Sequence, residues 1–131
     1  GHSVQVAGDK HDTFEDGILL LLARMMLESL DRCDQSYSAL QAFKLRWENT
    51  SYRHAPGVVD LGIDEIAQDS AALGELRVLL LEIQEMVTAF GNSIPATTIR
   101  QRWRVRGISY CDLQTDTVLE TVDRLVELIQ E

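Results

Sequence analysis

The sequence has few of the residues that mark disulfide frameworks and metal centres. It contains two cysteines, Cys33 and Cys111, which belong to no C-x-x-C pair. We therefore expect no disulfide framework, and we expect both thiols to be small buried groups in a reducing, cytoplasmic compartment. The histidines His2, His11 and His54 form no H-x-x-x-H ligand set, so zinc is not expected. No phosphate-cradling glycine loop or nucleophile motif is present, and we expect neither a cofactor nor catalysis.

Basic charge is also scarce. Twelve lysines and arginines stand against 21 aspartates and glutamates, which leaves a net charge of −9. A surface of this sign repels nucleic acids and anionic membranes, so neither is an expected partner. It would speed the approach of a basic protein, although acidity also serves simply to keep a protein in solution. The longest apolar run, residues 18–23, is too short to cross a membrane.

Linkers and low-complexity stretches are lacking as well, since the chain has two prolines and eight glycines. We expect residues 13–131 to form one domain, because that length can bury a core without disulfides or metal. Residues 1–12 carry no helical pattern, and Gly1–Ser3 looks like the remnant of a cleaved tag. We therefore predict a flexible segment before the domain.

Hydrophobic periodicity predicts helices over most of the domain. Residues 14–33 are apolar around most of the helix, with a narrow polar stripe that includes Arg24 and Glu28. Such a helix is buried on several sides, so it is either the centre of a bundle or also an interface with a partner. Residues 36–48 predict a half-buried helix with an aromatic stripe, and a loop follows over 49–62.

The strongest pattern lies in residues 70–90, where apolar residues recur at intervals of three and four. It predicts a helix that packs inside a bundle and ends at Gly91. Residues 63–69 are expected to form either a short helix before it or its first turns. Thr117 and Glu120 form a capping box at the start of the last helix.

Residues 92–114 allow two interpretations. Ser93 followed by Pro95 is typical of a helix start. Strict alternation with arginines over 99–106 is typical of a strand, which would give a small hairpin near residues 98–112. The helical interpretation is slightly favoured. Together the patterns predict an all-α fold, a single-domain bundle of four to six helices, with that hairpin left open as an addition.

Acidic residues recur along one face of the last predicted helix. They fall at spacings of three and four opposite the apolar face, and they are Asp116, Glu120, Asp123, Glu127 and Glu131. Their mutual repulsion costs about a few tenths of a kcal/mol per pair, which a basic partner would offset. The same spacing also arises in an ordinary solvated helix face. A second acidic group precedes the 70–90 helix and consists of Asp64, Glu65 and Asp69.

Four arginines form a single basic focus, at Arg100, Arg102, Arg104 and Arg106. Arginine suits bidentate contact with carboxylates or phosphates, and Trp103 between them could stack on a base. If the segment is a strand, the four side chains share one side and favour a phosphate site. If it is a helix, they spread around the axis and pair with acidic helices of the same fold, which is the preferred hypothesis.

Two pairs of carboxylates lie one helical turn apart, Glu82 with Glu85 and Glu120 with Asp123. If the pairs face each other across a bundle, they offer the oxygen ligands that Mg²⁺ prefers. This pattern resembles the E-x-x-E and E-x-x-D pairs of all-helical MazG-type nucleotide pyrophosphatases. The resemblance rests on these four residues, and it implies a Mg²⁺-dependent nucleotide hydrolase.

Three functions follow from these patterns, and the first is preferred. It is a non-enzymatic acidic binding domain, an immunity- or antitoxin-type inhibitor that occludes a basic toxin or nuclease. The second is a helical adaptor or self-associating protein that uses the apolar first helix, and the third is the Mg²⁺-dependent hydrolase. We expect a monomer or homodimer. The expected partner-binding residues are Asp64, Glu65, Asp69, Asp116, Glu120, Asp123, Glu127, Arg102, Trp103 and Arg104.

Overall fold

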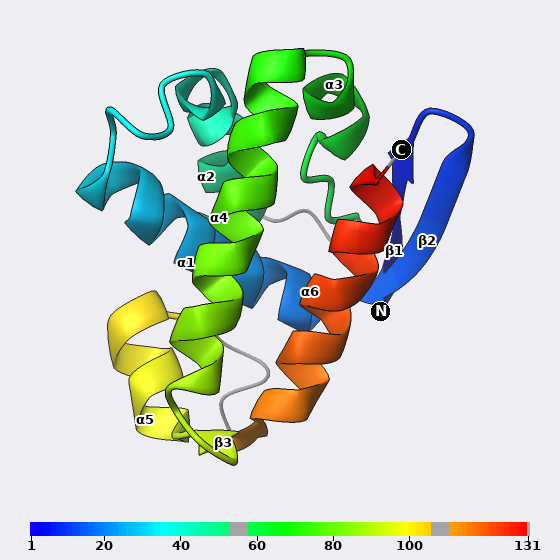
Figure 1. Ribbon diagram of the computed structural model, residues 1–131. Helices are drawn as coiled ribbons and strands as arrows, with labels where there is room; N and C mark the ends of the chain where they lie inside the picture. Colours follow the sequence, from blue (N-terminus) through cyan, green and yellow to red (C-terminus); the bar gives the residue numbers. More distant parts are fainter. Residues whose placement is uncertain (53–57, 106–110, 131) are drawn as a thin grey trace.

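The computed structural model describes residues 1–52, 58–105 and 111–130. Most of them are helical, which confirms the predicted helical fold, and two small antiparallel sheets accompany the helices (Figure 1). The helical elements are α1 (Asp16–Arg32), the 3₁₀ helix η1 (Leu40–Phe43), α2 (Lys44–Tyr52), α3 (Ile63–Ala67), α4 (Ser70–Thr88), α5 (Ala96–Thr98), the π-helix η2 (Ile99–Trp103) and α6 (Thr115–Ile129). The strands are β1 (His2–Ala7), β2 (Lys10–Glu15), β3 (Ser93–Ile94) and β4 (Leu113–Gln114).

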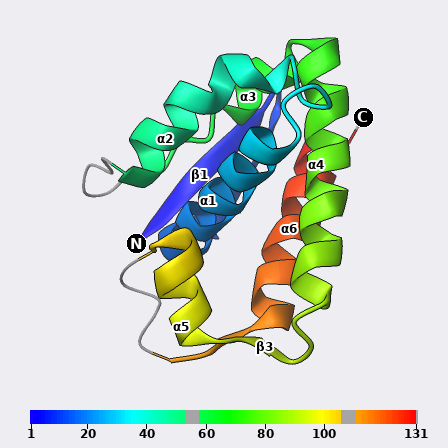
Figure 2. The same ribbon diagram turned by 90° about the vertical axis from the view of Figure 1, so that its left-hand side faces the viewer.

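Helix α1 runs through the centre of the molecule, with α2 on one side and the α4–α6 pair on the other (Figure 2). Leu19, Leu22, Met25 and Leu30 have no solvent exposure, so the prediction of a helix buried on several sides is confirmed. Each fully buried side chain of this size contributes about 1.5–3 kcal/mol. The apolar surface on which the self-association hypothesis rests is therefore packed inside the fold.

Helices α4 and α6 pack against each other and run in opposite directions (Figure 1). The apolar seam predicted for α4 is buried from Leu73 to Val87. Asp69 caps this helix by accepting hydrogen bonds from two backbone N–H groups of its first turn. Helix α6 begins at Thr115, before the predicted capping box, and the Thr115 hydroxyl donates to the Gly91 carbonyl at 2.7 Å. This bond ties the start of α6 to the turn that follows α4.

The N-terminal segment has regular structure, because β1 and β2 pair as an antiparallel hairpin. Its two-residue turn is Gly8-Asp9, and Gly8 has a φ of 65°, the left-handed conformation that tight hairpin turns require. Ser3, part of the expected tag remnant, is buried and donates a hydrogen bond to Asp16 at the start of α1. Residues that the sequence predicted as a flexible lead-in therefore form most of a regular hairpin that contacts the start of α1.

Polar side chains hold the hairpin against the rest of the fold. Gln5 is 1% exposed; its amide donates to the Val59 carbonyl at 2.7 Å and accepts from the Leu61 N–H at 3.1 Å. Val4 and Val6 point the other way and are exposed. This arrangement inverts the usual alternation of a half-buried strand, in which apolar residues face the core. The hydrophobic pattern therefore concealed the strand, and the Gly-Asp turn was the signal that could have revealed it.

Residues 92–114, which allowed two interpretations, contain a helix that ends at Trp103, because α5 continues directly into η2. The strands β3 and β4 of this segment pair with each other. Where the structure describes residues 98–112, the alternative hairpin does not form, and 106–110 lie outside the described residues. Packing decides the outcome: Ile99 and Trp103 are buried, whereas Gln101 between them is exposed. A strand would have placed all three side chains on one face.

Two expectations from composition can be compared with the structure. Cys33 is half-buried and Cys111 is exposed, so the expectation of two buried thiols is wrong. No helix within the described residues is long and apolar enough to cross a membrane.

Candidate functional site

The outer face of α6 carries a row of exposed carboxylates. Asp116, Glu120, Asp123 and Glu127 are all exposed, while the opposite side of the helix is buried. The predicted acidic stripe therefore exists as a surface, although Glu131 lies outside the described residues. With a rise of about 1.5 Å per residue, the row is about 16 Å long.

The one basic residue of α6 is bound to a carboxylate outside this row. The guanidinium of Arg124 is bound by Asp12 of β2 at 2.7 and 3.0 Å, and it lies over the ring of Phe14. The hydrogen bond lowers the pKa of Asp12 and raises the pKa of Arg124. Within the described ranges, no cation forms an ion pair with Glu120 or Glu127. Arg124 therefore directs its hydrogen bonds to Asp12, and the carboxylates of the row stay exposed.

The second predicted acidic group has partners inside the fold. Asp64 accepts a hydrogen bond from the Gly8 N–H in the hairpin turn at 2.8 Å. Glu65 forms an ion pair with Arg46 of α2, and Asp69 caps α4. These carboxylates hold α3 between its neighbours, so they are less available to a partner than the α6 row.

Helix α4 adds an exposed apolar strip beside the acidic row. Val78 and Leu81 are 58% and 57% exposed, and Gly74 has no atom within 4 Å of the position that a Cβ would occupy. The boundary between the two helices is marked by Gln84, which donates a hydrogen bond to Asp123 at 2.6 Å. We call this combined surface the α4–α6 face; it consists of Gly74, Val78 and Leu81 with the four carboxylates of α6. The pattern over residues 70–90 predicted the buried side of this helix and gave no indication of the exposed strip.

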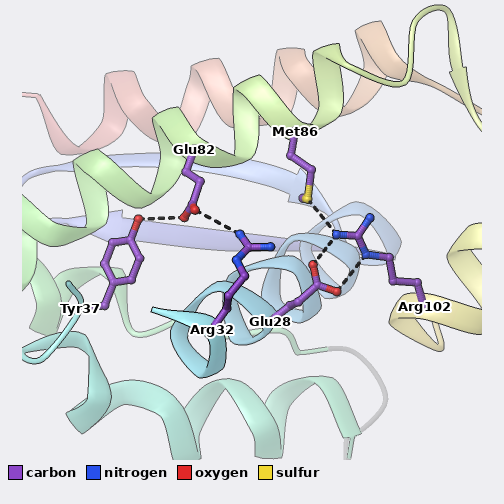
Figure 3. A network of polar contacts seen from close by, with 6 residues as sticks. All are labelled: Glu28, Arg32, Tyr37, Glu82, Met86 and Arg102. Atoms are coloured by element: carbon purple, nitrogen blue, oxygen red, sulfur yellow. Dashed lines mark hydrogen bonds and ion pairs between the residues drawn. The ribbon is translucent and has the colours of Figure 1, made fainter. Parts of the chain in front are cut away.

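The predicted arginine cluster is divided by the fold. Arg102 donates two hydrogen bonds to Glu28 of α1, at 2.6 and 2.9 Å, and one to the Met86 sulfur (Figure 3). The hydrogen bond to Glu28 raises the pKa of Arg102. The hypothesis of internal pairing is therefore confirmed for this arginine, with a partner on the central helix rather than on the last one.

The neighbours of Arg102 differ in their surroundings. Trp103 is 2% exposed and meets the ring of Phe90 edge-on, with 6.0 Å between the centroids. Its ring belongs to the core, which removes it from the surface where a partner would contact it. Arg104 is exposed, and Arg106 lies outside the described residues.

The paired carboxylates of the Mg²⁺ hypothesis do not converge. Glu82 accepts hydrogen bonds from the Tyr37 hydroxyl at 2.8 Å and from Arg32 at 3.1 Å (Figure 3). Burial, reinforced by the Glu82 carboxylate, raises the pKa of Tyr37. Glu85 is exposed. In the part of the chain that the structure describes, no group of three or more His, Cys, Asp or Glu side chains could hold a metal ion. The geometry thus gives the Mg²⁺ hypothesis no support.

Comparisons of the chain with protein-family models, with curated proteins and with solved structures find no match. The surfaces of the chain itself therefore carry the indications of function.

Proposed function

We propose that the protein is a non-enzymatic binding domain that neutralises a basic toxin or nuclease by covering its active surface. The observation that supports this proposal is the α4–α6 face, where four exposed carboxylates border an exposed apolar strip. Stable interfaces combine a desolvated apolar centre with a polar rim. The α4–α6 face offers both, and the four charged residues that define it are all acidic.

The mechanism is occlusion. A nuclease or nucleic-acid-directed toxin contacts phosphate through lysines and arginines, and the α6 carboxylates would occupy those side chains. Complementary charge speeds the encounter and makes the association rate fall with added salt. Val78 and Leu81 supply apolar surface at the centre, and burying the exposed half of each contributes about 1 kcal/mol. The α6 carboxylates therefore account for the salt-dependent part of the affinity, and Val78 and Leu81 account for the salt-independent part.

The proposal uses the α6 part of the predicted partner-binding set. The α3 carboxylates and Arg102 are engaged inside the fold, and Trp103 is in the core. A partner of this protein should therefore protect α6 and the outer side of α4 from solvent, and should leave α3 unchanged. Hydrogen–deuterium exchange of the complex measures that difference.

The test compares two charge reversals that change the net charge equally. The test variant carries Glu120→Lys and Glu127→Lys on the α4–α6 face. The control variant carries Asp34→Lys and Glu48→Lys, at an exposed and a half-buried carboxylate outside that face. Each tagged variant and the wild type are used to capture proteins from the native host extract at low and high salt. A captured basic protein is then purified, and its own activity is assayed with stoichiometric amounts of each variant.

We expect the wild type and the control variant to capture and inhibit the same basic protein. The variant with Glu120→Lys and Glu127→Lys should neither capture nor inhibit it. Equal inhibition by this variant would show that this surface is not used. Binding without inhibition would leave an adaptor and remove the inhibitor. A homodimer that persists in high salt and dissociates with Leu81→Asp would show that the strip serves self-association instead.

A further inference from the structure

An open cleft of about 890 Å³ is lined by residues of α1, the end of α2, η2 and the two residues that follow η2. Among its described lining residues are three arginines and no carboxylate, in a chain whose net charge is −9. The lining side chains that matter are Arg24, Arg100, Arg104, Tyr52, Leu20 and Val105. We call it the arginine cleft. It is separate from the α4–α6 face, and its function is independent of the one proposed above.

Arg24 is a buried charge whose polar partners are all neutral. It is 9% exposed, and its terminal nitrogens donate to the Ser51 and Trp103 carbonyls, both at 2.9 Å. Its guanidinium lies 3.4 Å from the centre of the Tyr52 ring. Its Nε has no hydrogen-bond partner, and no carboxylate among the described residues pairs with it. A buried charge is costly unless a counter-charge compensates it, so the fold holds this guanidinium ready for an anion.

Arg104 adds a second charge from a strained position. It closes η2 with a φ of 56°, a left-handed conformation that costs a residue with a Cβ on the order of 1 kcal/mol. Glycine or asparagine is usual at such a helix end. Burial lowers the pKa of Arg24, and the charge of Arg104 lowers it further. Two like charges held together at a local cost are typical of a site that compensates them with a ligand.

We propose that the arginine cleft binds a small molecule that carries phosphate groups. The planar guanidinium matches two oxygens of a phosphate at once, and several arginines around one cleft suit a ligand with two or more negative charges. The cleft volume is in the range of pockets that hold molecules the size of a nucleotide. Leu20, Val105 and the 61% exposed ring of Tyr52 give an organic group apolar and aromatic surface to contact.

The charge distribution favours a small ligand over a nucleic-acid strand. A strand extends beyond the cleft onto the surrounding surface, and the surface of a chain with a net charge of −9 repels phosphates. Glu28 and Asp31 already line the adjacent hollow that continues from Arg24 toward Arg102. A phosphate group confined to the cleft meets the arginines and avoids these carboxylates.

The experiment titrates the full chain with pyrophosphate, ADP and citrate by isothermal calorimetry at low salt. The variants are Arg104→Gln, which is exposed and leaves the core unchanged, and Arg24→Met, whose folding is checked by circular dichroism. Lys10→Gln is the matched control, because this substitution also removes one positive charge. Lys10 lies on the hairpin against the end of α6 and does not line the cleft. We expect pyrophosphate and ADP to bind, Arg104→Gln to weaken both about tenfold, and Lys10→Gln to match wild type.

The outcomes are separable. Tighter binding of ADP than of pyrophosphate assigns a contact to the organic part, and equal affinities assign recognition to the phosphates; both support the proposal. It is overturned if wild type binds neither phosphate probe, if Arg104→Gln binds them as wild type does, or if citrate binds as tightly as pyrophosphate. A single-stranded oligonucleotide that binds more tightly than ADP would replace the small ligand with a nucleic acid.

Discussion

Replacing Gln5 with alanine tests whether the N-terminal hairpin is an integral part of the fold. Gln5 is 1% exposed, and its side chain makes two hydrogen bonds to the backbone of Val59 and Leu61. The substitution removes both bonds and leaves a buried carbonyl and a buried N–H without their partner. Each such group costs about 1–3 kcal/mol. Because the costs of two neighbouring groups are not fully additive, we expect the free energy of unfolding to fall by about 2–4 kcal/mol for Gln5→Ala.

Urea unfolding followed by circular dichroism and tryptophan fluorescence measures this change. Val4→Ala is the matched control, since Val4 is the adjacent residue of the same strand and is 54% exposed; its effect should stay within about 0.5 kcal/mol. If Gln5→Ala and Val4→Ala shift the unfolding midpoint equally, the hairpin is not anchored through Gln5 and this reasoning is refuted.

Three further substitutions test the core, the α6 tie and the outer strip by the same urea assay. Leu76→Ala, at a fully buried position of α4, should cost about 2–5 kcal/mol. Gly74→Ala should stabilise the protein by about 0.5–1 kcal/mol, because the residue is helical and a Cβ meets no atom; destabilisation would show that α4 needs the glycine. Asp12→Asn should cost at most about 1 kcal/mol, since the pair with Arg124 is about one-third exposed. The hydrogen bond from Arg124 lowers the pKa of Asp12 in the folded protein below its ordinary 3.8. The stability that this pair contributes is therefore complete above pH 3.8 and is lost as the pH falls through the lowered pKa of the folded state. In Asp12→Asn, this step in the pH dependence of the free energy of unfolding should be absent.

The long helices were predictable because their signal is local. The apolar spacing in α1, α4 and α6 lies within each segment, and burial of Leu19, Leu76 and Val122 follows it. The ends of the helices were less accurate. Phe14, expected in the first helix, lies in β2, and its ring packs in the core from there. The strand could compete for this residue because pairing with β1 satisfies its backbone.

The long-range contacts could not be predicted from spacing. Arg102 and Glu28 are 74 positions apart, and Gln5 and Val59 are 54 apart, so no local pattern joins them. The same holds for Trp103, whose position among arginines suggested a surface residue until η2 turned it into the core. The long-range partners of polar side chains depend on how the helices pack. The sequence pattern predicts the helices but not their packing.

The two candidate surfaces also differ in how far the sequence predicts them. The α6 row followed from spacing, because a helix with one buried face must expose the other. The arginine cleft did not, since it joins Arg24, placed by the sequence in a polar stripe of a central helix, to Arg104, placed by the sequence in an ambiguous segment. Their proximity depends on the crossing of α1 and η2, which only the folded chain fixes.

The central position of α1 has a consequence for how the protein is made. This helix is synthesised before α4 and α6, whose buried residues share its core, and α6 ends at Ile129. At about 5–20 residues per second, roughly five to twenty seconds pass before its cover is complete. During that interval the apolar side chains of α1 are uncovered on the ribosome and exposed to aggregation or chaperone binding. A chain that stops before Thr115 should keep that surface open, bind a hydrophobic dye and aggregate, whereas a folded, monomeric fragment would show that α1 is covered without α6.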